Sequence, residues 1–412
     1  FIITTILAAI IMTSCAEDPP ASLEKYPSAN LPAPVLSTLE PSSQALAGVT
    51  VITITGTNFS ADARNNLVYF NGIPGTILNA TSTQLTVKVP NVVDDTVMVK
   101  IAVVGAQDFS NQYQYKMLPA WEEYYQFDKI AEKNYGIILD NSNNLYVSLF
   151  SDAATLVGGI WKITPPPFDS TSKTQYIPKG NTQKFDNLRY GPGGQLYGAR
   201  SARGIWKLVE GVGPASPWVS AALPTGTLIS NIEFDINQNL WALNDKDKIF
   251  KIKQDGSVTT YPFTGNLRAL RIYNGDLYVA AFKDNIEGVW KIIIDANGDL
   301  GTAELYFDIS SIRSLGTKIT AMTFAADGDM LIGFDRGPNP ILIVKPNKSY
   351  EELYPGVIGA NSVICMYWAP NSTSLFFVRG EEVNTDTPPK IVVSQITLRV
   401  EMEKMGAPYY GQ

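Results

Sequence analysis

The feature that most constrains this chain is a sequence unit that recurs six times between residues 118 and 412. Each copy holds an apolar strand, a Leu-Tyr-like strand after a turn, and a Gly-Ile-Trp-Lys-like strand shortly afterwards. The second of these strands recurs with an average spacing of 46 residues, at Leu145, Leu196, Leu240, Leu277, Met330 and Leu375. A period of this length, with about four strands per unit, indicates a β-propeller. Six copies predict six blades.

The two ends of the repeat region are predicted to meet in the sixth blade. We expect Lys390–Ser394 to be its third strand and Tyr124–Phe127 to be its outer strand. Such closure leaves no sheet edge free. The alternative is a seventh blade built from residues 401–412 and 121–129.

An Asp-x4-Leu-Tyr/Trp motif is intact at Asp140–Tyr146 and Asp235–Trp241. Through it the repeats resemble the NHL and SMP-30/gluconolactonase-like propellers. The resemblance implies the fold and, for the lactonases, a channel metal with oxygen ligands that would suit Ca²⁺. Because Asp140 and Asp235 recur within the repeat, we interpret them as turn residues rather than metal ligands. We expect no cofactor, and a Ca²⁺ ion in the channel is the alternative.

Residues 32–117 hold short strands separated by turns. Thr50–Thr55, Leu85–Val89 and Val97–Ile101 alternate apolar and polar residues, and Asn71-Gly72 marks a hairpin. About seven such strands predict an immunoglobulin-like sandwich. The expected fold class is therefore all-β, with an immunoglobulin-like β-sandwich at residues 32–117 followed by a six-bladed β-propeller at residues 118–412.

The sandwich segment resembles the IPT/TIG family of immunoglobulin-like domains. The resemblance rests on stretches that follow one another along the chain: Leu39-Glu40-Pro41 with Gly48, Ile54–Phe59, Val68–Gly72, Val87–Pro90 and Tyr113–Tyr115. It implies a spacer or interaction module without catalysis. We also expect positive φ angles at Gly56 and Gly72 and a core position for Phe59.

The N-terminal residues 1–14 are predicted to be a signal peptide, because their apolar run is too short to span a bilayer and ends at a cysteine. Met12-Thr13-Ser14-Cys15 resembles the lipobox of bacterial lipoproteins, which implies cleavage before Cys15 and acylation of its thiol. An ordinary secretory signal is the alternative. Residues 15–31, rich in Pro, Ser and Ala, are expected to form a flexible tether.

The residues after the predicted anchor indicate a location. Ala16-Glu17-Asp18 resembles the export signal of Bacteroidota surface lipoproteins. This resemblance implies a lipid-anchored protein of the outer membrane that faces the cell exterior. Whether the anchor faces the periplasm instead stays open.

The chain contains no histidine, which excludes Ser-His-Asp and Cys-His nucleophiles and His-ligated zinc. Its net charge of −7 argues against nucleic acid as a partner. Cys15 and Cys365 are the two cysteines, so no disulfide framework is expected, and Cys365 is interpreted as a small core residue.

Functional residues of a propeller are expected on the loops that lead into the inner strands and on those between the second and third strands. The candidate ligand-binding residues on these loops are Tyr135, Asn187, Arg200, Arg203, Arg268, Lys283, Asp335, Arg336 and Arg379. Arginine beside Asn, Asp and Tyr suits hydroxylated or acidic sugars. A solubilising role for each of these polar side chains is the alternative.

Lipoproteins of this layout resemble accessory glycan-binding proteins of Bacteroidota nutrient-uptake systems. The resemblance implies binding of an extracellular polysaccharide or oligosaccharide beside a transporter complex of the SusC/SusD type. The alternatives are a metal-dependent lactonase or lyase and a structural, protein-binding surface component.

Overall fold

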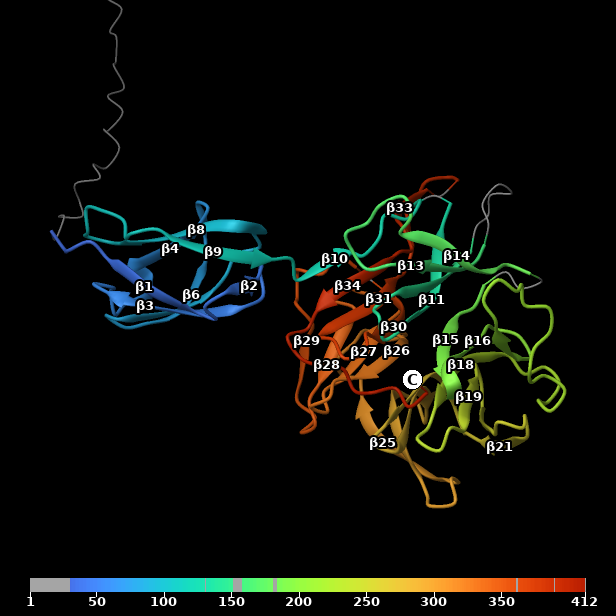
Figure 1. The fold of residues 1–412 in the computed structure, drawn as a ribbon. Coiled ribbons are helices and arrows are strands. Elements are labelled where there is room, and N and C mark those ends of the chain that lie inside the picture. Colours follow the sequence, from blue (N-terminus) through green and yellow to red (C-terminus); the bar gives the residue numbers. More distant parts are fainter. Residues whose placement is uncertain are drawn as a thin grey trace, which may run out of the picture. The chain divides into compact units, whose positions relative to one another are not determined.

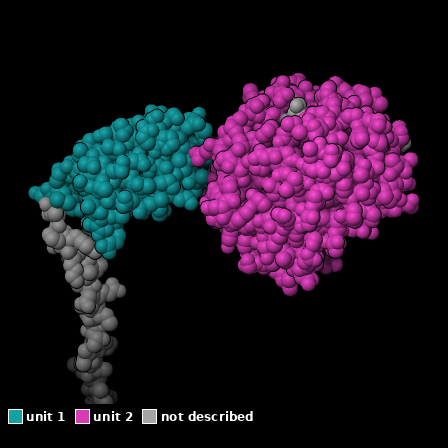
Figure 2. All heavy atoms as spheres, turned by 90° about the horizontal axis from the view of Figure 1, so that it is seen from below, with its two compact units in different colours: residues 1–118 teal, residues 119–412 magenta. Residues whose placement is uncertain are grey.

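The computed structural model describes residues 30–129, 131–150, 158–180, 184–360, 362–388 and 390–411. The chain divides into two compact units, residues 1–118 and residues 119–412 (Figure 2). Regular structure in the described ranges is β apart from two short 3-10 helices, Ala63–Asn65 and Pro192–Gly194. None of their helices is long and apolar enough to cross a membrane. The predicted signal peptide, Cys15 and the tether up to residue 29 lie outside the described residues.

The first unit is a sandwich of two sheets. One sheet has the strand order β1-β3-β7-β6 and the other the order β2-β9-β8-β4-β5. The strands are β1 (Val35–Glu40), β2 (Gln44–Leu46), β3 (Val51–Thr57), β4 (Asn66–Phe70), β5 (Ile73–Pro74), β6 (Thr76–Ala80), β7 (Gln84–Lys88), β8 (Asp94–Val103) and β9 (Tyr113–Leu118). The immunoglobulin-like prediction is confirmed.

The sandwich core follows the predicted alternation. Ile52, Ile54 and Phe59 are buried in one apolar cluster. Asn71 and Gly72 both have positive φ angles and form the two-residue hairpin between β4 and β5, as expected. The prediction of positive φ at Gly56 is wrong. This glycine is required by space instead, because a Cβ atom there would collide with the Val35 carbonyl oxygen and the Phe59 ring.

The second unit is a propeller whose sheets lie around a common centre (Figure 1). Its first three blades are β11 (Lys133–Leu139), β12 (Leu145–Phe150), β13 (Gly159–Ile163) and β14 (Lys173–Pro178); β15 (Asn187–Gly191), β16 (Gln195–Ala199) and β17 (Ile205–Leu208); and β18 (Ile229–Phe234), β19 (Leu240–Asn244), β20 (Lys248–Ile252) and β21 (Val258–Pro262). The second blade has three strands, and a single bridge from Ile205 to Val219 lies where a fourth would pair.

The next two blades are β22 (Asn266–Tyr273), β23 (Asp276–Lys283), β24 (Ile286–Ile294) and β25 (Leu300–Asp308); and β26 (Ile319–Phe324), β27 (Met330–Phe334), β28 (Ile341–Val344) and β29 (Tyr350–Glu352). The sixth has the order β30 (Val363–Trp368), β31 (Ser374–Arg379), β34 (Thr397–Glu401) and β10 (Trp121–Glu123). The first strand of each blade is its inner strand. Neighbouring inner strands contact one another around the ring, and β30 contacts β11, so the six-bladed prediction is confirmed.

Two details of the sixth blade differ from the prediction. Its outer strand is β10, which pairs with β34 three residues before the expected Tyr124–Phe127. Tyr124 and Phe127 are buried core residues. Its third strand is β34 rather than Lys390–Ser394, because Leu398 and Val400 are buried whereas Val392 is 60% exposed. β33 (Ile391–Val393) pairs instead with β32 (Glu382–Val383) in a separate hairpin.

The Asp-x4-Leu-Trp motif has a structural role. The Asp235 carboxylate accepts hydrogen bonds from the Trp241 indole N–H at 2.8 Å and from the backbone and side chain of Asn239 at 2.9 and 3.0 Å. Asp140 accepts from Asn144 and from the Tyr146 hydroxyl in the same way. The interpretation of both aspartates as turn residues agrees with these contacts.

Asp235→Ala is expected to lower the free energy of unfolding of the propeller by about 3 kcal/mol, because it leaves the buried Trp241 N–H without an acceptor. Urea unfolding followed by tryptophan fluorescence measures this loss, since all tryptophans lie in the second unit. Asp255→Ala, in an exposed turn, is the control and should cost less than about 1 kcal/mol. Equal effects of the two substitutions would contradict the assignment.

Candidate functional site

Irregular pairing at the start of the inner strands shapes one end of the central channel, which we call the mouth. β18, β26 and β30 each contain a shift in register next to their first residue, and β22 contains one after its second residue. The residues without a cross-strand partner at these shifts are Ser230, Arg268, Thr320 and Ile364. Bulges of this kind redirect side chains and are common beside functional sites. All four residues line a cavity at the mouth.

The mouth cavity has a volume of about 480 Å³. Besides the bulge residues it is lined by Lys318 and Ser362, which precede inner strands, and by residues that follow second strands, such as Asp245 and Asp335. These are the two loop sets that the sequence predicts for a propeller site. The lining combines cations, carboxylates and hydroxyl groups, which suits a polar ligand.

Lys318 and Asp335 differ in how they are held. The Asp335 carboxylate accepts from the Arg336 guanidinium at 2.8 Å and from the Lys318 backbone N–H at 2.9 Å. Burial raises the pKa of Asp335, but these partners outweigh it and hold the pKa below its usual value. Lys318 is exposed, and among the described residues no carboxylate lies within ion-pair distance of its Nζ atom. Its charge is therefore available to a ligand.

A side pocket of about 260 Å³ adjoins the mouth cavity and shares Arg268 and Lys318 with it. Arg268 Nε lies 3.4 Å from the Glu287 carboxylate, which also accepts from the Ile319 N–H at 3.0 Å. Burial raises the pKa of Glu287. Phe282, 37% exposed, and the fully exposed Leu315 give this pocket an apolar wall beside its charges.

Below the mouth, side chains of the inner strands form layers across the channel. One layer, which we call the floor layer, consists of inner-strand residues, each paired across the sheet with an aromatic or apolar residue of the second strand. They are Ile138, Arg189, Glu233, Arg271, Thr323 and Tyr367. The residues two positions before the floor layer on the same strands have smaller side chains, and they include Asn187, Asn231, Ala269 and Cys365. They leave a channel cavity of about 210 Å³ that shares Ser230 and Thr320 with the mouth cavity.

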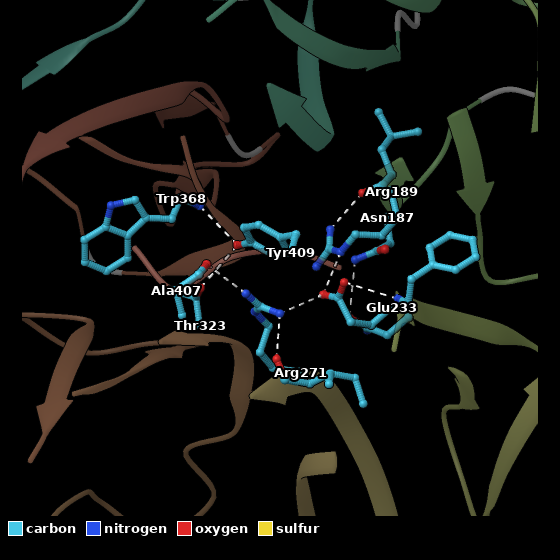
Figure 3. A network of polar contacts seen from close by, with 12 residues as sticks. Asn187, Arg189, Glu233, Arg271, Thr323, Trp368, Ala407 and Tyr409 are labelled. Atoms are coloured by element: carbon cyan, nitrogen blue, oxygen red, sulfur yellow. Dashed lines mark hydrogen bonds and ion pairs between the residues drawn. The ribbon is translucent and has the colours of Figure 1, made fainter. Parts of the chain in front are cut away.

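Three charges meet in the floor layer (Figure 3). Arg189 Nε lies 2.9 Å from Glu233 Oε2, and Arg271 Nη1 lies 3.7 Å from the same oxygen. Burial lowers the pKa of Arg189, but the interactions of its guanidinium, above all with the nearby Glu233 carboxylate, together outweigh burial, so the pKa of Arg189 is raised. Burial also raises the pKa of Tyr367 well above its ordinary value, so this residue stays a neutral hydroxyl.

The C-terminal segment Met402–Gly411 crosses the far end of the channel below the floor layer (Figure 1). Arg271 donates to the carbonyls of Ala407 and Pro408 at 3.1 and 2.9 Å, and its guanidinium lies 3.8 Å from the centre of the Tyr409 ring. The Tyr409 ring stacks on Tyr367 with centroids 4.4 Å apart, and its hydroxyl oxygen lies 3.2 Å from that of Thr323. The mouth is thus the open end of the channel.

The structure brings three of the predicted site residues to these cavities. Arg268 and Asp335 line the mouth, and Asn187 lines the channel cavity. Arg336 is held by the Asp335 carboxylate, and Lys283 pairs with Asp284.

The other four predicted residues, like Arg336 and Lys283, line none of the three cavities. The Tyr135 ring packs under the Lys184 ammonium, and the Arg200 guanidinium packs over the Trp206 ring. Arg203 donates to the carbonyls of Ala221 and Leu223. Arg379 is buried, where it donates to the Ser394 carbonyl and pairs with Glu123 of the closing strand. The last two arginines therefore support loops and the ring closure.

Sequence reasoning missed the floor layer. The signal was present, since Glu233 interrupts the apolar strand Ile232–Phe234 with a charge, and Arg189 and Arg271 do the same in their strands. Cys365 lines the channel, its thiol donates to the Tyr135 carbonyl at 3.2 Å, and burial raises its pKa to about 12. In the described ranges no group of three or more acidic or cysteine side chains could hold a metal ion.

Comparison of the sequence with known families gives one match. Residues 34–117 match the model of the IPT/TIG domain. These residues of the first unit form an IPT/TIG domain. The family resemblance seen in the sequence is thereby confirmed for this part of the chain. No curated protein is similar enough in sequence to match the chain.

Solved structures share the fold at low sequence identity. A Bacteroides thetaiotaomicron protein of unknown function is 13% identical with a TM-score of 0.50, over 89% of this chain and 98% of its own. A second protein from that organism, provisionally named a phosphatase, is 11% identical with a TM-score of 0.54, over 90% and 98%. A luciferin-regenerating enzyme is 14% identical with a TM-score of 0.50, over 71% and 98%. These likenesses concern the fold alone.

Proposed function

We propose that this protein is a surface lipoprotein whose propeller binds an extracellular glycan at the channel mouth. The observation that carries the proposal is the set of bulged inner-strand residues that line one cavity together with the unpaired Lys318 ammonium. A large cavity with a few convergent polar groups is where ligands bind in most folds.

The side pocket favours a sugar over other polar ligands. A sugar ring has an apolar C–H face and a rim of hydroxyl groups. Phe282 and Leu315 offer an apolar surface, while Arg268, Asn285 and Glu287 offer donors and acceptors around it. The mouth cavity continues from this pocket, so a chain of several sugar units would fit the combined surface.

The proposed location and partners rest on the sequence. Acylation of Cys15 would anchor the chain to the outer membrane, and the IPT/TIG domain would act as a spacer for the propeller. The partner proposed for such an accessory protein is a SusC/SusD-type uptake complex, which would take up the bound glycan.

The purified protein should be retarded in affinity gels that contain its polysaccharide, and a panel of extracellular polysaccharides identifies which one. Lys318→Ala is expected to weaken this binding about 10-fold, because it removes an unpaired charge from the mouth. Lys253→Ala, an exposed lysine in the β20–β21 turn, is the control. Failure to bind any polysaccharide, or equal retardation of the Lys318 variant and the wild type, would count against the proposal.

A further inference from the structure

The channel cavity is bordered by a buried guanidinium group with one unpaired hydrogen-bond donor. Arg189 lines this cavity and is 6% exposed. Its Nε pairs with Glu233, and its Nη1 donates to the Leu188 carbonyl at 2.7 Å. Among the residues that the structure describes, none accepts a hydrogen bond from Nη2. The guanidinium carbon lies 5.6 and 5.4 Å from the centres of the Tyr367 and Tyr409 rings, which leaves Nη2 as the donor that a ligand in the cavity could use.

The charges around the cavity do not balance. In the floor layer, Arg189 and Arg271 face a single carboxylate, that of Glu233, and the other members are uncharged (Figure 3). Asp186 also lines the cavity, but it is paired with Lys184 at 2.8 Å. One positive charge thus lacks a counter-charge among the described residues. Buried charge is costly unless it is paired, so the site is suited to a ligand with one negative charge.

Two further polar atoms in residues that line the same cavity lack a hydrogen-bond partner among the described residues. Asn187 Oδ1 and Ser230 Oγ are buried without a hydrogen bond among the described residues, and both residues line the cavity. Asn187 is 6% exposed. Buried polar groups nearly always have a hydrogen-bond partner, so these atoms indicate a hydroxylated ligand or a water molecule in the cavity. The volume of about 210 Å³ is several times the ~30 Å³ of one liquid water.

We propose that the channel cavity binds the carboxylate of an acidic sugar, with Arg189 as its ligand and with Asn187 and Ser230 bonded to neighbouring hydroxyl groups. Hexuronates are the sugars that combine one carboxylate with ring hydroxyl groups. A planar guanidinium donor matches a carboxylate better than a point charge would. The inference rests on the proposed function, since it takes the ligand to be a glycan that enters by the mouth.

Calorimetric titration of the purified protein with glucuronate, galacturonate and mannuronate, and with the three matching neutral hexoses, tests the inference. At least one hexuronate should bind about 10-fold more tightly than its hexose. Asn187→Asp keeps the side-chain size but adds a negative charge to the cavity, and should weaken this binding about 10-fold. Asn141→Asp, in an exposed turn after β11, makes the same change elsewhere and should leave affinity unchanged.

Thermal unfolding of both variants verifies that they are folded. Hexuronates that bind no better than hexoses, or an unaltered hexuronate affinity in Asn187→Asp, would overturn the inference. If the gels still retard the wild type on a neutral polysaccharide and Lys318→Ala weakens this retardation, the proposed function survives without the acidic sugar. If no polysaccharide and no monosaccharide binds, both fail.

Discussion

Deletion of residues 407–412 is expected to lower the free energy of unfolding of the propeller by about 5 kcal/mol. The deletion removes Tyr409, which is 7% exposed, stacks on Tyr367 and contacts Thr323. It also removes two carbonyl acceptors from Arg271, whose side chain is fully buried. The floor layer would then face solvent at the far end of the channel. Urea unfolding of the propeller, followed by tryptophan fluorescence, measures the loss.

Met405→Ala is the matched control for this deletion. Met405 lies in the same segment but is 42% exposed, so its truncation should change the free energy of unfolding by less than about 0.5 kcal/mol. An unfolding midpoint of the shortened protein equal to that of the wild type would show that the C-terminal segment does not stabilise the ring.

Glu233→Gln is expected to cost about 4 kcal/mol of the free energy of unfolding. The substitution preserves the size of the side chain but removes the one carboxylate that faces both Arg189 and Arg271. Glu233 is 1% exposed, so water cannot replace the lost charge. Breaking a buried ion pair from one side leaves uncompensated charge, which is why this loss should exceed that of an ordinary hydrogen bond.

Glu287→Gln provides the comparison for this second prediction. Glu287 is also a buried carboxylate, 8% exposed, but it pairs with the half-buried Arg268, which lines the mouth. We expect a cost of about 1 kcal/mol. If the two substitutions prove equally mild, the floor layer is not held by its charges.

The sequence was sufficient to predict the six blades, because the repeat places a strand pattern at a regular interval and each pattern became a strand. It misplaced the sixth blade's last two strands for a physical reason. Ile391–Val393 has the composition of a strand and forms one, but in a two-stranded hairpin on the surface. Which apolar segment enters the ring depends on burial by neighbouring blades, as at Leu398 and Val400.

The site could be predicted only in outline. The loop rule selected Arg268, Asp335 and Asn187, which line the mouth and channel cavities, because loop position follows from strand order. The contact of Arg189 and Arg271 with Glu233 depends on the register of three separate strands, which cannot be predicted from the sequence pattern. Arg203 and Arg379 were chosen as loop arginines, yet their guanidinium groups bond to backbone carbonyls of the protein itself.

The central claim is that the open end of the channel is the ligand site. A crystal structure of the protein with a fragment of the polysaccharide that the panel identifies tests it most directly. We expect a sugar unit between Arg268 and Lys318, with its chain continuing toward Arg189. A fragment bound on the outer strands of the blades or on the IPT/TIG domain, with the mouth empty, would contradict the account.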